Sequence, residues 1–234
     1  MQSLKQLFLI TAISLVSTTA QAFTVTIEDP EIQAKPSGDE LFTVDFNDLA
    51  VDTTNSFTME SSDGINAYTY SGDLLIRQTN IHGGADNSYY IEPRTLEPSS
   101  FNIATDKNQK YFGFWWSAGD ASNIITFFNN DEIVATFHTQ DVIATLAELP
   151  NKQNYYCNPT PMFAEEVCHE PYAFVNFFFE GEEAYNRVTI SSTASGSNFE
   201  SDNHTFSTKA QEITGCIITD GYVCASIETK LYAD

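Results

Sequence analysis

Basic residues are scarce in this sequence. Its 234 residues include 10 Lys and Arg against 32 Asp and Glu, which gives a formal net charge of −22. A chain with so little positive charge cannot displace the counterions of phosphate groups, so we exclude nucleic acid and anionic membrane surfaces as partners. The chain is not a disordered acidic tail either, because 42% of its residues are hydrophobic and 18 are Phe.

Long hydrophobic runs are also missing. The N-terminal run, residues 7–16, follows Lys5 and is too short to span a bilayer. Ala20 and Ala22 then supply small residues at the two positions that signal peptidase reads. We therefore predict a signal peptide at residues 1–22, export, and no transmembrane segment after cleavage. An uncleaved N-terminal anchor is the alternative.

Cysteine is limited to four residues, all beyond the predicted cleavage site. An even number of cysteines in an exported chain indicates disulfides. We favour the pairs Cys157–Cys168 and Cys216–Cys224, because each closes a short loop between predicted strands. The other two connectivities remain open, as does a zinc site that would use His169 beside Cys168.

Helix patterns are rare, and strand patterns dominate. The one helix candidate is 139–149, which Pro150 ends. The absence of an internal repeat excludes propellers and solenoids. Regularly spaced strands separated by turn residues indicate an all-β protein, an antiparallel β-sandwich of the jelly-roll or lectin-like type. The predicted strands are 24–27, 41–46, 68–70, 74–77, 88–91, 111–116, 124–128, 132–138, 174–179, 183–191 and 199–206.

This pattern predicts a sandwich domain at residues 23–206 and a disulfide-closed hairpin at 207–234. Within the domain, residues 151–171 form a long polar loop that the first cysteine pair would pin, and such loops are often functional. Tyr155 and Tyr156 in this loop are candidates for an exposed platform that stacks on sugar rings. Trp116 is a further candidate, although packing in the core is the favoured interpretation of its large side chain.

Three segments carry a family resemblance: 87–91, 111–127, and 174–177 together with 199–204. In this order and spacing they resemble a family of bacterial exosortase-dependent, PEP-CTERM-type surface proteins, over roughly residues 40–206. The resemblance implies a secreted or surface-associated sandwich, with Asp120 and Asn123 at the family's characteristic turn as ligand-binding candidates. The chain has no Pro-Glu-Pro motif, so we do not expect exosortase anchoring.

Oxygen-bearing side chains lie near the predicted first and last core strands. Asp45 lies in the predicted strand 41–46 and Asp48 just beyond it, while Asp202 and Asn203 lie in the predicted strand 199–206. The first and last strands of a jelly roll commonly end near each other, so these four residues predict a Ca²⁺ site. A solvated acidic edge is the alternative.

These observations predict a non-enzymatic protein, secreted or at the cell surface, that binds glycan or extracellular matrix. An extracellular enzyme acting on polysaccharide through Glu and Asp side chains is one alternative, and a structural subunit of a surface filament or matrix is another. No Gly-x-Ser-x-Gly motif or motif-borne carboxylate pair is present, so no catalytic residue is predicted. The sequence does not indicate an oligomeric state.

Overall fold

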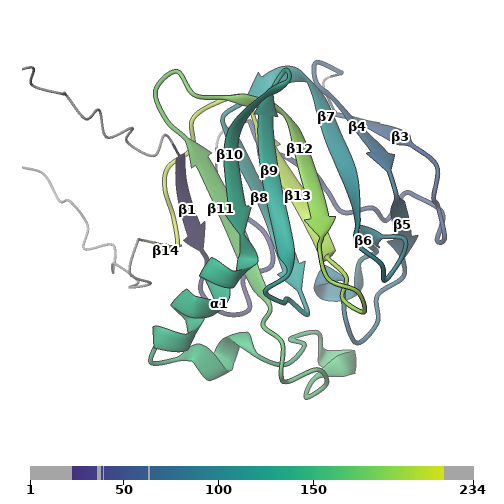
Figure 1. Cartoon of the computed structure of the whole chain (residues 1–234), viewed down its shortest axis with the longest axis vertical. Coiled ribbons are helices and arrows are strands. Elements are labelled where there is room, and N and C mark those ends of the chain that lie inside the picture. Colours follow the sequence, from purple (N-terminus) through teal and green to yellow (C-terminus); the bar gives the residue numbers. More distant parts are fainter. Residues whose placement is uncertain (1–22, 36–37, 39, 63, 219–234) are drawn as a thin grey trace, which may run out of the picture.

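Two antiparallel sheets pack face to face and form a β-sandwich, as the sequence predicts (Figure 1). The computed structural model describes residues 23–35, 38, 40–62 and 64–218. The predicted signal peptide and most of the predicted C-terminal hairpin, including Cys224, lie outside the described residues. No helix in the described part of the chain has the length and apolar character needed to span a lipid bilayer.

The first sheet has eight strands, and its order brings together segments from both ends of the described chain. In order, these strands are β14 (Cys216–Ile217), β1 (Phe23–Ile27), β11 (Ala173–Phe179), β8 (Tyr111–Ser117), β13 (Glu200–Ser207), β6 (Tyr90–Pro93) and β5 (Leu74–Arg77), with β2 (Phe42–Val44) also paired to β13. Because β14 pairs with β1, the described part of the C-terminal segment belongs to this sheet.

The second sheet has six strands: β10 (Glu132–His138), β9 (Asn123–Asn129), β12 (Tyr185–Ser192), β7 (Ser99–Gln109), β4 (Ala67–Gly72) and β3 (Phe57–Glu60). Sequence reasoning missed β3 and β7. Strand β7 contributes only Phe101 and Ile103 as large apolar residues to the core, and its second half is polar. The composition of such a segment does not identify it as a strand; its pairing with neighbouring strands does.

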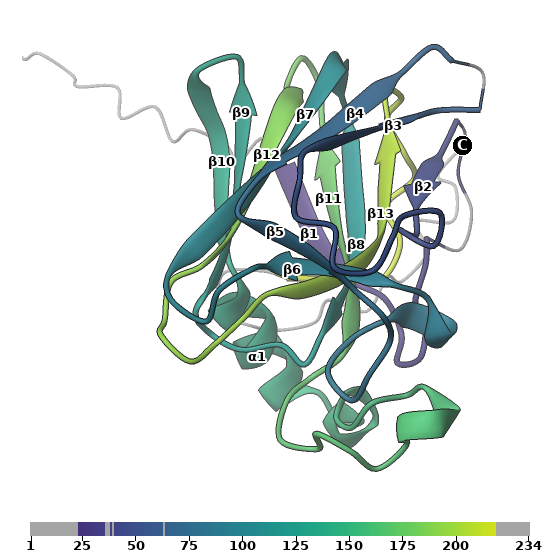
Figure 2. The same cartoon turned by 90° about the vertical axis from the view of Figure 1, so that its right-hand side faces the viewer.

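Short helices and a long loop close one end of the sandwich (Figures 1 and 2). The predicted helix is confirmed as α1 (Thr139–Glu148), and it ends just before Pro150. The loop that follows contains the 3₁₀ turns η2 (Lys152–Tyr155) and η3 (Pro161–Phe163). A further 3₁₀ turn, η1 (Ala85–Asn87), precedes β6.

Aromatic side chains fill the core between the sheets. Along β8, the buried side chains of Phe112, Phe114 and Trp116 belong to the core cluster between the sheets, while the alternate residue Trp115 packs in a separate cluster on the outer face. The whole of β8, which the sequence predicts as a strand at 111–116, is buried. Core packing of Trp116 is therefore confirmed, and this side chain cannot stack on a ligand.

A bulge in β13 decides which side chains reach the outer face of the first sheet. Relative to β8, the register of β13 shifts between Asp202 and Thr205, and Asn203 has a left-handed φ of 49°. One extra residue reverses the side-chain alternation. Before the bulge, Glu200 and Asp202 therefore point outward, whereas beyond it His204 packs in the core.

Candidate functional site

A cleft of about 510 Å³ opens on the outer face of the first sheet, near its β5 and β6 edge. Strands β5, β6 and β13 provide part of its lining, including Arg77, Glu92 and Glu200. The remaining lining comes from loops far apart in the sequence, which contribute Asn80, His82, Arg94, Leu96, Asp120, His169, Glu170, Ser197 and Asn198. The volume of this cleft lies within the range of small-molecule sites.

Strand pairing places two carboxyl groups side by side in this cleft. Ser201 of β13 pairs with Ile91 of β6 in an antiparallel register, so the preceding residue Glu200 lies opposite the following residue Glu92. Both side chains line the cleft. These two residues are 108 positions apart in the sequence, and neither was among the predicted site residues.

The carboxyl group of Glu92 has a basic partner. The Nε atom of Arg77 donates a hydrogen bond of 2.6 Å to Oε1 of Glu92. Burial raises the pKa of Glu92, while the hydrogen bond and charge of Arg77 oppose that shift. The same contact raises the pKa of Arg77. Arg77 therefore favours the ionised form of Glu92 inside the cleft.

The carboxyl group of Glu200 has a different environment. No side chain among the described residues forms an ion pair or hydrogen bond with it. Burial raises the pKa of Glu200 well above its ordinary value, and the neighbouring charge of Glu92 raises it further. Both pKa values are therefore raised, and only that of Glu92 is held down by a basic partner.

The predicted ligand residue Asp120 lines the cleft, but its carboxylate is engaged by two neighbouring loops. Oδ1 accepts hydrogen bonds from the backbone N–H and the hydroxyl of Ser122, and Oδ2 accepts one from Ser197. Asp120 therefore joins the loop after β8 to the loop before β13. This arrangement holds the cleft wall in place.

The other predicted residue of this turn, Asn123, is buried. Its Oδ1 accepts a hydrogen bond of 3.1 Å from the indole N–H of Trp116, and its Nδ2 donates one of 2.9 Å to the carbonyl oxygen of Asn198. Asn123 does not line the cleft. Its contacts position Asn198, whose own side-chain oxygen is buried and has no hydrogen-bond partner in the described structure.

The predicted aromatic platform is wrong for Tyr155. This side chain is only 3% exposed, and its hydroxyl donates a hydrogen bond of 2.9 Å to the carbonyl oxygen of Glu28. The large apolar ring of Tyr155 is buried against the end of the sandwich. The polar sequence of the surrounding loop does not indicate this burial. Tyr156 is partly exposed and lines a separate hollow of about 300 Å³ beside Lys152 and His169.

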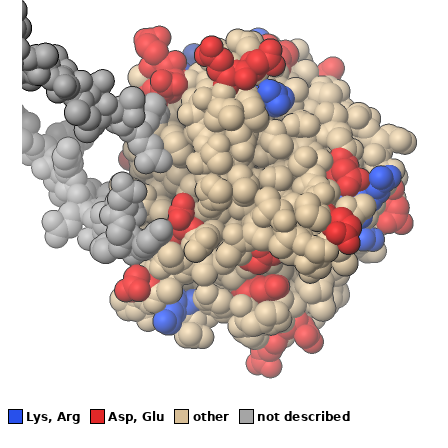
Figure 3. Space-filling model, viewed as in Figure 1, with Lys and Arg blue, Asp and Glu red and all other residues tan. Residues whose placement is uncertain are grey.

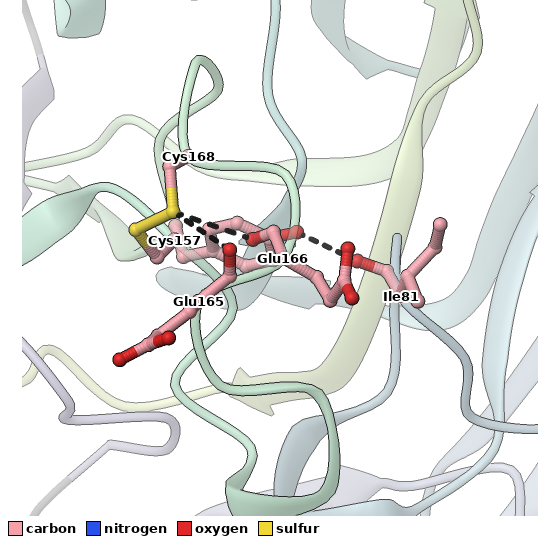
Figure 4. Close-up of a disulfide and its surroundings, with 6 residues drawn as sticks. Ile81, Cys157, Glu165, Glu166 and Cys168 are labelled. Atoms are coloured by element: carbon pink, nitrogen blue, oxygen red, sulfur yellow. Dashed lines mark hydrogen bonds between the residues drawn. A yellow bond between two sulfur atoms is a disulfide. The ribbon is translucent and has the colours of Figure 1, made fainter.

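The predicted disulfide Cys157–Cys168 is confirmed, and it lies beside Glu165 and Glu166 (Figure 4). The closed loop is tied to the chain segment that carries Asn80 and His82, because the side chain of Asn158 donates a hydrogen bond of 3.1 Å to the carbonyl oxygen of Ile81. Asn80 and His82 line the cleft together with His169 and Glu170, which directly follow Cys168. The Cys216–Cys224 pairing lies outside the described residues.

The four predicted calcium ligands have unequal environments. Asp45 and Asp48 are exposed, whereas Asp202 is fully buried. The carboxyl of Asp202 accepts hydrogen bonds from Ala85 N–H, from the Ser88 hydroxyl and from Asn203 N–H. The side chain of Asn203 donates instead to the carbonyl oxygen of Gln33.

These contacts leave Asp202 with a structural function, because it fastens η1 to β13 beside the cleft. Burial raises its pKa to about 8. Within the described residues there is no group of three or more His, Cys, Asp or Glu side chains that could hold a metal ion. Calcium binding stays a prediction.

Comparison of the sequence with protein-family models gives no match, and no curated protein matches it significantly. The chemistry of the cleft is therefore the guide to function.

Proposed function

We propose that the cleft binds a carbohydrate chain, and that the protein is an exported, surface-associated or extracellular glycan-binding protein of a bacterium. The observation that carries this proposal is the mixed polar lining of the cleft, which combines carboxyl, amide, imidazole and guanidinium groups. A sugar presents hydroxyl groups that both donate and accept hydrogen bonds, so it suits such a lining. Asn198 lines the cleft, and its side-chain oxygen is an acceptor without a partner among the described residues.

The charges of the cleft favour an uncharged sugar over an acidic one. Its two arginines already have carboxylate partners, since Arg77 binds Glu92 and the Nε atom of Arg94 lies 2.9 Å from Asp73. On the face that Figure 3 shows, acidic side chains occur at several separate places and basic ones are few, in line with the 32 acidic and 10 basic residues of the sequence. An anionic polysaccharide would meet a like-charged protein, and among the described residues of the cleft both arginines are already paired.

Export has independent support in the disulfide. Bonds such as Cys157–Cys168 form and persist in oxidising compartments outside the cytoplasm. This agrees with the signal peptide predicted at residues 1–22 and with a ligand that belongs to the cell surface or its surroundings.

The proposal is tested with the mature protein, residues 23–234, on an array of neutral and acidic glycans. We expect binding to a neutral glycan. Asn198→Ala should weaken that binding roughly 2- to 10-fold, the range expected when one hydrogen bond is lost. The matched control is Asn108→Ala, because Asn108 is exposed at the far end of β7 and does not line the cleft.

Binding of no glycan at all would overturn the proposal. Equal weakening by Asn198→Ala and Asn108→Ala would place the binding site elsewhere. Preference for acidic glycans would contradict the charge argument.

A further inference from the structure

The two opposed carboxyl groups in the cleft have the arrangement that cleavage of a glycosidic bond requires. We propose that the protein hydrolyses the neutral sugar chain that it binds, with Glu200 as general acid and base and Glu92 as nucleophile. This inference rests on the proposed carbohydrate binding. It goes beyond the non-enzymatic role that the sequence predicts.

Strand geometry places the Cβ atoms of Glu92 and Glu200 close together. Residues directly opposite on antiparallel neighbours have Cβ atoms about 4.5–5.5 Å apart and point to the same face. Glu200 and Glu92 hold such positions on β13 and β6. Glycosidases that retain the anomeric configuration keep their two carboxyls roughly 5–5.5 Å apart, whereas inverting enzymes need a wider gap that admits a water molecule. Two Glu side chains on opposed positions can bring their carboxyls to the shorter of these separations, so we assign the retaining mechanism to this pair.

The surroundings of each carboxyl assign its role. Arg77 engages one oxygen of Glu92, Oε1, and this contact favours the negative charge that a nucleophile needs. Glu200 is half-buried and lacks a basic partner among the described residues, so desolvation raises its pKa and favours the protonated form that a general acid needs. Two carboxyls whose environments differ in this way are the usual acid and nucleophile of such sites.

The reaction then proceeds in two displacements. In the first, Glu200 gives its proton to the glycosidic oxygen as the bond to the anomeric carbon breaks, and the free oxygen of Glu92 attacks that carbon to form a glycosyl ester. The leaving chain departs as an alcohol. In the second, the Glu200 carboxylate takes a proton from water, the water oxygen attacks the anomeric carbon, and the ester bond to Glu92 breaks. The sum is hydrolysis with retention, and both side chains return to their initial states.

The test uses the mature protein and a soluble form of whichever neutral glycan it binds on the array. New reducing ends are measured over time, and the anomeric form of the first product is determined by NMR. We expect cleavage with retention. Glu200→Gln should lower kcat roughly 10²- to 10⁴-fold, the usual contribution of a positioned general acid. A second substrate is the dinitrophenyl glycoside of the same sugar, whose leaving group departs without a proton. For this substrate, kcat/KM of Glu200→Gln should remain close to that of the wild type.

Glu92→Gln should abolish hydrolysis of both substrates while glycan binding persists. The matched control is Glu182→Gln, which makes the same chemical change at an exposed residue beyond the far end of β11 and should leave the rate unchanged. Labelling of the wild-type protein is a second test, and a folding defect in a variant cannot affect it. The 2-deoxy-2-fluoro glycosyl fluoride of the same sugar should label Glu92, as located by peptide mass spectrometry.

Binding without new reducing ends would overturn the hydrolysis and leave the carbohydrate-binding proposal intact, whereas absence of binding would overturn both. An inverted product, or a label on another residue, would exclude Glu92 as the nucleophile. Equal rate losses in the Glu182→Gln and Glu200→Gln variants would exclude Glu200 as the acid.

Discussion

Removal of the Cys157–Cys168 disulfide should destabilise the protein by an amount that follows from the length of its loop. The double substitution Cys157→Ser and Cys168→Ser opens a loop whose ends are 11 residues apart. In the chain-entropy model, opening a loop of this length restores entropy to the unfolded state and lowers its free energy by about 2.8 kcal/mol. We expect the free energy of unfolding to fall by about that amount.

The same substitution should also weaken glycan binding, because the disulfide holds the loop whose end leads directly into two residues of the cleft. His169 and Glu170 line the cleft immediately after Cys168. The loop keeps other attachments when the disulfide is absent, among them the hydrogen bonds from Tyr155 to Glu28 and from Asn158 to Ile81. Partial loss of affinity is therefore expected, with the sandwich still folded.

Urea unfolding of the mature wild type and the double variant, at one pH, measures the change. The two tryptophans, Trp115 and Trp116, are good reporters, because Trp115 packs beside Tyr172 at the base of the loop. Far-UV circular dichroism before unfolding provides the control for an intact fold. The dependence of the free energy on urea should steepen slightly, since the unfolded variant is less compact. A change below about 1 kcal/mol would refute the entropic argument for this loop.

Two further predictions concern pH and processing. His204 is fully buried between Tyr70 and Ser201, and burial lowers its pKa to about 3. Lowering the pH from 7 to 5 therefore protonates this imidazole in the unfolded state only, because an exposed histidine has a pKa of about 6.5. The free energy of unfolding should fall by about 2 kcal/mol. Urea titrations at the two pH values should show that His204→Gln lacks this part of the pH dependence; equal dependence in both proteins would contradict it. N-terminal sequencing of protein collected outside the cell should begin at Phe23; a mature chain that keeps Met1 would contradict cleavage.

Local patterns determined much of the architecture. The continuous aromatic run of β8, the Asn and Asp turn between β9 and β10, and the helix that stops before Pro150 could each be predicted from short stretches of sequence. The pairing of Cys157 with Cys168 was also predictable, because the two residues are close in sequence. These features depend on neighbours within a dozen residues, and local conformational preference is sufficient to indicate them.

Tertiary structure alone decided which residues form the cleft. Glu92 and Glu200 meet because β6 pairs with β13, and the pattern of neither strand specifies its partner. The bulge at Asn203 turns Glu200 outward and His204 inward, although both have even positions on one strand. Tyr155 lies in a polar loop yet is buried. The physical reason is common to all three: side-chain alternation is a local property, whereas strand register and burial depend on contacts between segments far apart in the chain.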